Sequence, residues 1–265
     1  MLWTVALSDS TSSAQTDTSI PTLTPDVTVT LDQSNRILLP VPLQLMWAYA
    51  LGLTVTRMRF NLPHLKPIGR PMIRPIEQAA APSSRPQIAE FWRHNFTLYP
   101  VEPIEVDRTN TTAIAERDFC ILTLGDGDRN VPQGEMYSIR YTTSFTPTIN
   151  AWSAAPVLTT DDTLNPGRYS VIGFETFNTG GIAARLAFPG PPLPNSLPQV
   201  RPGVVMDAAA GNQMTRYFRW GYMGVYGEFE SYAPPVPEVI QTAATVNPEG
   251  ILDIVPVRLG GRVGI

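Results

Sequence analysis

The sequence predicts an all-β fold, a β-sandwich of the jelly-roll type with two short helices in its connections. Proline and glycine are frequent, at 27 and 19 of 265 residues, and this punctuation leaves little room for long helices. About ten segments have the length and apolar pattern of strands. Two pairs of these segments, over 112–145 and 166–188, flank turn sequences and predict two long hairpins. Two smaller fused jelly rolls, divided near residue 147, are the alternative.

The clearest β-structure lies in 166–188. Turn residues stand at 165–167 and again at 178–181, with a strand-length run between them. This run carries large apolar side chains on both faces, for example Val171 on one and Phe174 on the other. A strand with one face in water would alternate with polar residues, so we expect this strand to be buried on both sides.

Two short helices are expected in the connections. Segment 42–51 starts with proline, is followed by Gly52 and is apolar all round, which predicts a short buried helix. Segment 86–95 places apolar residues at helical spacing. Its Glu90 and His94 stand four apart, and we interpret them as a structural pair rather than an acid and base.

We expect three regions along the chain. Residues 1–25 are an extended N-terminal arm, because they are rich in Ser and Thr and nearly uncharged after residue 8. The sandwich occupies 26–232 and contains a stiff, proline-rich excursion over 63–86 that is suited to contacts. A tail, 233–265, ends in an apolar stretch that returns to its own sheet or docks on a neighbour.

Composition limits the partners. A net charge of −4 predicts no strong bulk attraction to nucleic acid or to an anionic membrane. Charged residues make up only 16%, which is common where neighbours cover much of the surface. Lys66 is the one lysine among many arginines, a bias that suits interfaces or reflects a GC-rich genome. The N-terminal apolar run is too short for a signal or a transmembrane segment, so we expect synthesis in a cytoplasm.

No residue pattern declares an enzyme or a cofactor site. Cys120 stands alone in an apolar strand, which predicts a buried, inert thiol rather than a Cys–His nucleophile. His64 and His94 are the two histidines, so a histidine-based metal cluster is not expected. Phosphate-binding glycine loops and nucleophile elbows are missing from the sequence. We therefore predict that the protein is not an enzyme and needs no cofactor.

One loop partly matches a calcium site. Asp126, Asp128 and Asn130 have the one-three-five spacing of such a loop. However, Val131 replaces the glycine at the sixth position and Tyr137 replaces the bidentate glutamate. A solvated turn is the preferred interpretation, and a partial calcium site is the alternative.

Two charged pairs have a similar ambiguity. Glu228 and Glu230 are two apart on a predicted strand, hence about 7 Å apart on one face. That separation suits an inverting glycosidase, but one strand can scarcely supply both sides of a sugar cleft, so a surface pair is preferred. Arg57 and Arg59 share a strand face, and we expect an interface or solvated face there rather than a phosphate site.

Several features together resemble the jelly-roll virion coat proteins of small tailless icosahedral viruses, particularly bacteriophages. They are the uncharged arm, the arginine bias, the excursion over 63–86, the paired hairpins and an aromatic, glycine-containing strand over 214–231. The resemblance implies a structural virion protein, a capsid subunit that self-assembles into an icosahedral shell through arm, loop and tail contacts. Its partners would be copies of itself and other virion proteins, and its location the virion after synthesis in the host cytoplasm. The chain lacks the basic arm of RNA-packaging coat proteins.

A second class of function stays open. A carbohydrate- or receptor-binding β-sandwich would use exposed aromatic side chains as a platform, and Trp220, Tyr222 and Tyr226 are the candidates.

Overall fold

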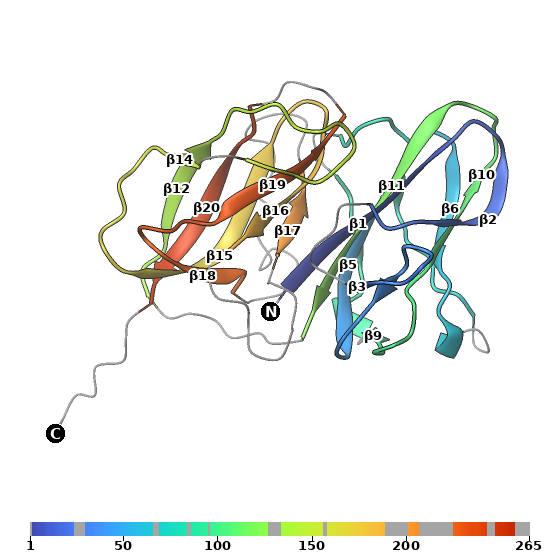
Figure 1. Ribbon diagram of the computed structural model, residues 1–265, viewed down its shortest axis with the longest axis horizontal. Coiled ribbons are helices and arrows are strands. Elements are labelled where there is room, and N and C mark those ends of the chain that lie inside the picture. The colour runs from blue at the N-terminus through green and yellow to red at the C-terminus, as the bar shows by residue number, and fades with distance from the viewer. Residues whose placement is uncertain are drawn as a thin grey trace.

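The structure is a computed structural model that describes residues 2–23, 30–65, 69–83, 86–94, 96–126, 134–155, 158–188, 201–206, 225–242 and 247–257. Within these ranges the chain is all-β, as the sequence predicts, and its strands form two sandwiches side by side (Figure 1). The described helical turns are two short 3-10 turns.

The first sandwich contains β1 (Leu2–Thr11), β2 (Gln15–Ile20), β3 (Thr30–Leu31), β4 (Ile37–Leu38), β5 (Leu43–Leu51), β6 (Val55–Phe60), η1 (Pro63–Leu65), β7 (Ile76–Glu77), β8 (Ala89–Glu90), η2 (Trp92–His94), β9 (Thr97–Leu98), β10 (Val106–Asn110) and β11 (Glu116–Gly125). The second contains β12 (Tyr137–Thr142), β13 (Ser153–Ala154), β14 (Thr159–Thr160), β15 (Arg168–Phe177), β16 (Gly181–Ala187), β17 (Gly203–Val205), β18 (Gly227–Glu230), β19 (Val236–Gln241) and β20 (Glu249–Pro256).

The first sandwich has jelly-roll strand order. One sheet runs β1-β11-β5, with β7, β8 and β9 along the far edge of β5. The facing sheet runs β2-β10-β6 and is extended by Met72, which bridges Arg59 of β6. For this count the β3–β4 pair and β7 are set aside, and β8 and β9 count as one strand. In chain order, β1, β11, β5 and β8/β9 are then the first, eighth, third and sixth strands of the roll. β2, β10, β6 and the segment at Met72 are its second, seventh, fourth and fifth strands. The β3–β4 hairpin is an insertion.

The second sandwich repeats this order. One sheet runs β14-β12-β20-β15-β18 and the other β13-β19-β16-β17. With β14 set aside as an added edge strand, the order is again first, eighth, third, sixth and second, seventh, fourth, fifth. The chain is therefore a tandem of two jelly rolls, the arrangement held above as the alternative. It passes from one roll to the other between Gly125 and Tyr137, ahead of the division expected near 147.

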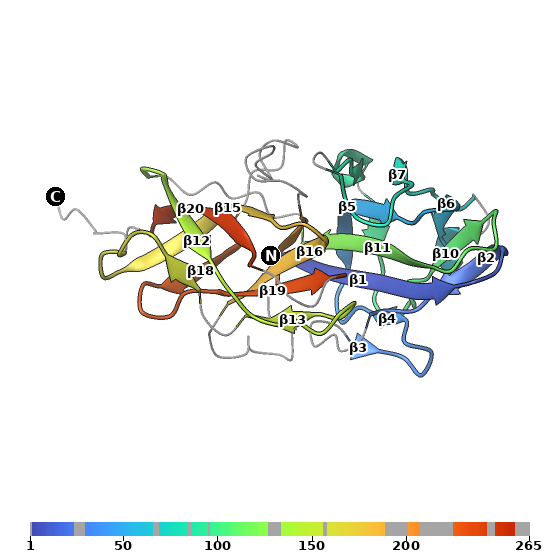
Figure 2. The same cartoon turned by 90° about the horizontal axis from the view of Figure 1, so that it is seen from above.

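The two rolls point in the same direction. Trp3 of β1 and Arg201, just before β17, form a parallel bridge. The first strand of one roll therefore runs alongside, and parallel to, the fifth strand of the other. Strands alternate in direction along a jelly roll, so its first and fifth strands run the same way. Corresponding turns of the two rolls therefore emerge at the same end. In both views the start of β1 lies at the boundary between the rolls (Figures 1 and 2).

The sheet that contains β1, β5 and β11 is buried on both faces. One face, which includes Val5 and Leu122, packs against β2, β10 and β6. Residues of the opposite face, such as Tyr49 and Ile121, belong to the same buried cluster as Val204 and other core residues of the second roll. A strand covered on both sides reads as a continuous apolar run, and this is the pattern these three strands show.

The expected helices are wrong. Segment 42–51 is β5, a central strand, because a ten-residue apolar run satisfies burial equally well as a strand covered on both faces. Segment 86–95 contains β8 and the 3-10 turn η2. There the Glu90 carboxylate forms an ion pair with Arg93 Nε, 3.5 Å away, and not with His94.

The expected hairpins are wrong as well, although their strands exist. β15 pairs with β18 and β20, whereas β16 pairs with β17 and β19 in the opposite sheet. The turn between them crosses the sandwich. β11 and β12 belong to different rolls.

The expected arm over 1–25 is also wrong. β1 pairs with β11 along its whole length and β2 pairs with β10, because the apolar residues of β1 complete two cores. Most of the expected tail returns to its own sheets, where β20 lies between β12 and β15. Residues 258–265 lie outside the described part. No helix in the described residues is long and apolar enough to cross a membrane.

Candidate functional site

A backbone joint holds the two rolls together. The amide of Thr4 donates to the carbonyl oxygen of Arg201 at 2.8 Å, and the Arg201 amide donates to the Leu2 carbonyl at 3.1 Å. Gly203 continues the contact, because a Cβ there would stand 2.9 Å from the Cβ of Thr4 and force the two chains apart. The edge of one roll is thus paired with the edge of the other.

A buried ion triad covers this joint. The Glu238 carboxylate accepts from Arg185 Nε at 2.6 Å, and its other oxygen is paired with Arg201. Arg185 also donates to the Thr4 carbonyl at 3.0 Å, and its guanidinium carbon lies 4.0 Å from the ring centre of Trp152. Arg185 is 1% exposed, so its charge depends on these partners and not on water. Glu238 therefore holds in place the two arginines, Arg185 and Arg201, that contact the backbone of β1 in the first roll.

A second buried polar cluster ties the two sheets of the first roll. Arg108 is fully buried and donates to Asp118 at 2.8 Å, to Asp9 at 2.8 Å and to Gln15 at 2.7 Å. Burial raises the pKa of Asp118 to about 6, although hydrogen bonds from Asn110 and the charge of Arg108 act in the opposite direction. All of these side chains come from strands of the first roll. We therefore interpret the cluster as a structural network that holds its two sheets together.

Exposed apolar side chains mark the same turn in both rolls. Val101, between β9 and β10, is 82% exposed, and Tyr232, between β18 and β19, is 84% exposed. They are the most exposed large hydrophobic side chains in the described residues. Both turns join the sixth strand to the seventh, so the parallel rolls present them at one end of the molecule. We call this end the turn face, defined by residues 99–102 and 231–234.

The first of these turns is held in an unusual conformation. Val101 has φ of 66°, a left-handed value that is rare for a β-branched residue and costs of order 1–3 kcal/mol. His64 supports the turn: its ring packs edge-on against Tyr99 at 5.0 Å, and its Nδ1 lies 2.6 Å from Glu102. The surrounding fold thus holds an apolar side chain out into solvent.

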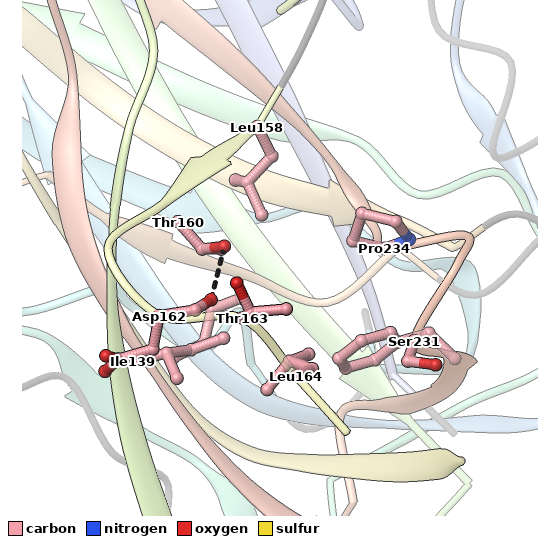
Figure 3. A pocket seen from close by; sticks show the side chains of 10 residues that line it. Ile139, Leu158, Thr160, Asp162, Thr163, Leu164, Ser231 and Pro234 are labelled. Carbon is pink, nitrogen blue, oxygen red and sulfur yellow. Dashed lines mark hydrogen bonds between the residues drawn. The ribbon is translucent and has the colours of Figure 1, made fainter. Parts of the chain in front are cut away.

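A cavity opens beside the second of these turns (Figure 3). Its volume is about 230 Å³, and it lies between residues 158–164 and 231–234. Ile139, Phe229 and Leu252 form a buried apolar floor. The more exposed lining is mixed, with apolar side chains such as Leu164 beside polar ones such as Asp162 and Ser231. The cavity therefore combines an apolar interior with a hydroxyl- and carboxylate-bearing rim.

The candidate calcium loop falls largely outside the described residues. Asp126 is described and exposed, whereas Asp128 and Asn130 are not described. Across the described ranges, no group of three or more His, Cys, Asp or Glu side chains is placed to hold a metal ion.

The described residues of the two sugar-site alternatives do not form such a site. Glu228 pairs with Arg168 at 2.6 Å and accepts from the hydroxyl of Ser170, so it is a member of a surface ion pair. Tyr226 is fully buried, because its ring packs edge-on against Phe174 inside the second roll, and it is therefore no exposed platform. Trp220 and Tyr222 lie outside the described residues.

Two other interpretations can be compared with the geometry. Arg57 and Arg59 both bind the carboxylate of Asp17 on β2, across β10, at a partly exposed surface. Cys120 is fully buried, and burial raises the pKa of its thiol, as expected of an inert core cysteine.

The sequence matches no protein-family model, and no curated protein is significantly similar to it. Among solved structures, the crystal structure of the major capsid protein P2 from Bacteriophage PM2 is similar at 11% sequence identity, with a TM-score of 0.24 and coverage of 100% of both chains. The jelly-roll assignment itself rests on the strand order of the two sandwiches.

Sequence reasoning missed the joint and the turn face. Arg185 and Glu238 are 53 positions apart, and no local spacing connects them. Their one signal is the occurrence of a charged residue inside otherwise apolar strands. Val101 and Tyr232 carry no signal in the sequence, because their exposure depends on the turns of the two rolls.

Proposed function

We propose that this protein is a structural virion protein, a capsid subunit that associates with copies of itself to form a closed shell. The observation that carries the proposal is the parallel fixation of two jelly rolls, which places two exposed apolar turns at one end of a single body. Isolated exposed side chains are ordinary, but a matched pair on corresponding turns offers a repeated contact to neighbours. The low fraction of charged residues, 16%, supports the same conclusion.

The proposal changes which segments make the contacts. β1 and β2 belong to the sheets of the first roll, and β19 and β20 belong to those of the second, so none of these strands serves as a free tie. Contacts between subunits then fall to loops, above all the turn face, and to residues beyond 257. The proposal assigns no enzymatic activity to the chain, and it places the protein in the virion after synthesis in the host cytoplasm.

Electron microscopy of the purified protein, combined with light scattering, tests this proposal. Shells or defined oligomers are expected, and a protein that stays a 29.1 kDa monomer under all assembly conditions would contradict it.

The double variant Val101→Asp with Tyr232→Asp should prevent assembly without lowering the melting temperature, because both side chains project into water and Asp tolerates the left-handed conformation. Ile149→Asp, at a 47% exposed site on the opposite end of the second roll, is the matched control and should still assemble. Equal behaviour of the two proteins would refute the role of the turn face.

A further inference from the structure

A threonine, an asparagine and two carboxyl groups meet inside the first roll. The Thr54 hydroxyl donates to one oxygen of the Glu116 carboxylate, and the Thr54 amide donates to the other at 2.9 Å. The side-chain nitrogen of Asn110 donates to Glu116 at 2.8 Å and to Asp118 at 3.1 Å. The same nitrogen lies 3.4 Å from the Thr54 hydroxyl oxygen. A nucleophilic hydroxyl, a carboxamide and a base are thus in contact, as acyl transfer from an amide to a hydroxyl requires.

The backbone directs these side chains toward one another. Thr54 directly precedes β6, Asn110 ends β10, and both carboxyl groups come from β11. The pairing of β10 shifts register at Asn110 both toward β2 and toward β6. Such a bulge changes the direction of the side chain that it carries. The Asn110 amide therefore reaches from one sheet of the sandwich to β11 in the facing sheet.

These groups are shielded from water. Asn110 is 2% exposed, Glu116 9% and Asp118 0%. Among the described residues, the side-chain carbonyl oxygen of Asn110 has no hydrogen-bond partner. A buried amide carbonyl without a partner is unfavourable, and an ester carbonyl, which is a weaker acceptor, reduces this penalty. The site therefore excludes competing water and favours conversion of the amide.

The two carboxyl groups differ in their affinity for a proton. Burial acts to raise the pKa of Glu116, but hydrogen bonds from Thr54 and Asn110 outweigh it and hold that pKa below its usual value. Burial raises the pKa of Asp118 to about 6. Glu116 is therefore the ionised base beside the hydroxyl, and Asp118 is the carboxyl that protonates more readily. Carboxyl groups whose pKa values are pushed apart in this way are typical of acid–base chemistry.

We propose that Thr54 and Asn110 join in an intramolecular ester, which cross-links the start of β6 to the end of β10. Glu116 takes the proton of the Thr54 hydroxyl, and the oxygen attacks the side-chain carbonyl carbon of Asn110. The carbon–nitrogen bond of the amide then breaks, and Glu116 returns the proton to the nitrogen, which leaves as ammonia. One hydroxyl and one amide yield one ester and one ammonia, and no oxidant or cofactor is consumed.

The cross-link closes a covalent loop over residues 54–110. It constrains the unfolded chain in the way that a disulfide does, and so stabilises the first roll without one. The reaction needs only the folded first roll, because all of its groups lie there. The inference therefore does not depend on capsid assembly, and a cross-linked monomer would support it even if no shell forms.

Intact-mass spectrometry of the full-length protein tests the proposal. The measured mass should lie below the sequence mass by one ammonia. Trypsin should release peptides 37–57 and 109–117 as one joined species. Mild alkali should separate them, restoring Thr54 and leaving an aspartate in place of Asn110. An unaltered mass after prolonged incubation of the folded protein at neutral pH would overturn the proposal.

Variants separate the ester from other reactions that release ammonia. Thr54→Val and Glu116→Gln nearly keep the side-chain shapes and should each have the full mass of their sequence, whereas Thr54→Ser keeps the hydroxyl and should keep the cross-link. Near-ultraviolet circular dichroism shows whether each variant is folded. Ammonia loss that persists in Thr54→Val would assign the loss to a cyclic imide at Asn110 and overturn the ester.

Thr56→Val is the matched control. The Thr56 hydroxyl lies two positions from Thr54 but bonds to the backbone carbonyl of Thr109 at 3.3 Å instead of to a carboxylate. This variant should therefore lose ammonia and form the joined peptide to the same extent as the unmodified protein. A joined peptide that disappears in Thr56→Val but persists in Thr54→Val would place the bond at the wrong threonine and refute the assignment.

Discussion

Replacing Glu238 by Gln should destabilise the protein strongly, because it leaves two buried guanidinium groups without their shared counter-charge. Glu238 lies between Arg185 and Arg201, whose side chains are 1% and 10% exposed. Gln has nearly the same shape, so the substitution changes charge and little else. Both arginines also lie at the contact between the rolls, which makes the variant a test of the joint.

Removing one member of a buried ion pair costs about 3–5 kcal/mol. The side chain of Glu238 keeps 11% exposure, so the lower end of this range is expected, about 3 kcal/mol. For a chain of this size, each kcal/mol lowers the melting temperature by about 2–4 °C, which gives a decrease of about 6–12 °C. Because Arg185 also binds the Thr4 carbonyl of the first roll, the variant should in addition unfold less cooperatively.

Differential scanning calorimetry and urea denaturation measure both effects. Glu228→Gln is the matched control: the same substitution removes the partner of Arg168, but that pair is 50% and 36% exposed. Exposed pairs contribute about 0–1 kcal/mol, so the control should melt within a few degrees of the unmodified protein. A Glu238→Gln variant no less stable than the control would refute the argument that the triad holds the rolls together.

Three further outcomes are expected. Asp118 has a pKa of about 6 in the folded protein against 3.8 as its ordinary value, so its contribution to stability is complete below about pH 4 and is lost as the pH rises through 6. The difference of about 2.2 pKa units corresponds to about 3 kcal/mol. Urea denaturation at pH 4 and pH 7 should therefore show that the difference in unfolding free energy between the protein and Asp118→Asn changes by up to this amount. An unchanged difference would show that the carboxyl titrates normally. Gly203→Ala should cost about 1–3 kcal/mol in thermal unfolding, because its Cβ would stand 2.5 Å from the carbonyl oxygen of Ala184, and an unaltered melting temperature would mean that the joint can yield. Cys120 should not react with a thiol reagent in the native protein and should react fully in denaturant. Fast labelling of the native protein would show that the core of the first roll opens readily.

Local patterns located strands well and their partners poorly. The predicted strand that carries Arg57 and Arg59 is β6, and 166–188 contains β15 and β16. The turn at 178–181 also forms, with the amide of Gly181 donating to Asn178 at 3.1 Å and Gly180 at φ of 80°. The turn sequence does not determine which sheet the second strand joins. The same turn serves a hairpin or a crossing between two sheets, and partner strands elsewhere in the chain, such as β18 and β19, decide between them.

The expected helix at 42–51 shows a second limit. Its apolar residues follow no helical or strand period, because both faces of β5 are buried, one in each core. Periodicity then carries no information about the type of element, and the flanking proline and glycine were a weak guide. The error over 1–25 has a related cause, since Ser and Thr are as suited to a strand as to an extended arm.

The strand order has a consequence for how the chain folds during synthesis. In each roll the last strand lies between the first and the third: β11 separates β1 from β5, and β20 separates β12 from β15. Neither of these sheets can close until its last strand has left the ribosome, which for β1 means waiting for residues 116–125. At about 5–20 residues per second, that delay is roughly 6–25 s. Through this interval the apolar β1 lacks its partner, and the joint with Arg201 needs still more chain. Folding dominated by such distant pairings is slow, so the apolar β1 is open to aggregation for longer than a strand with a nearby partner would be.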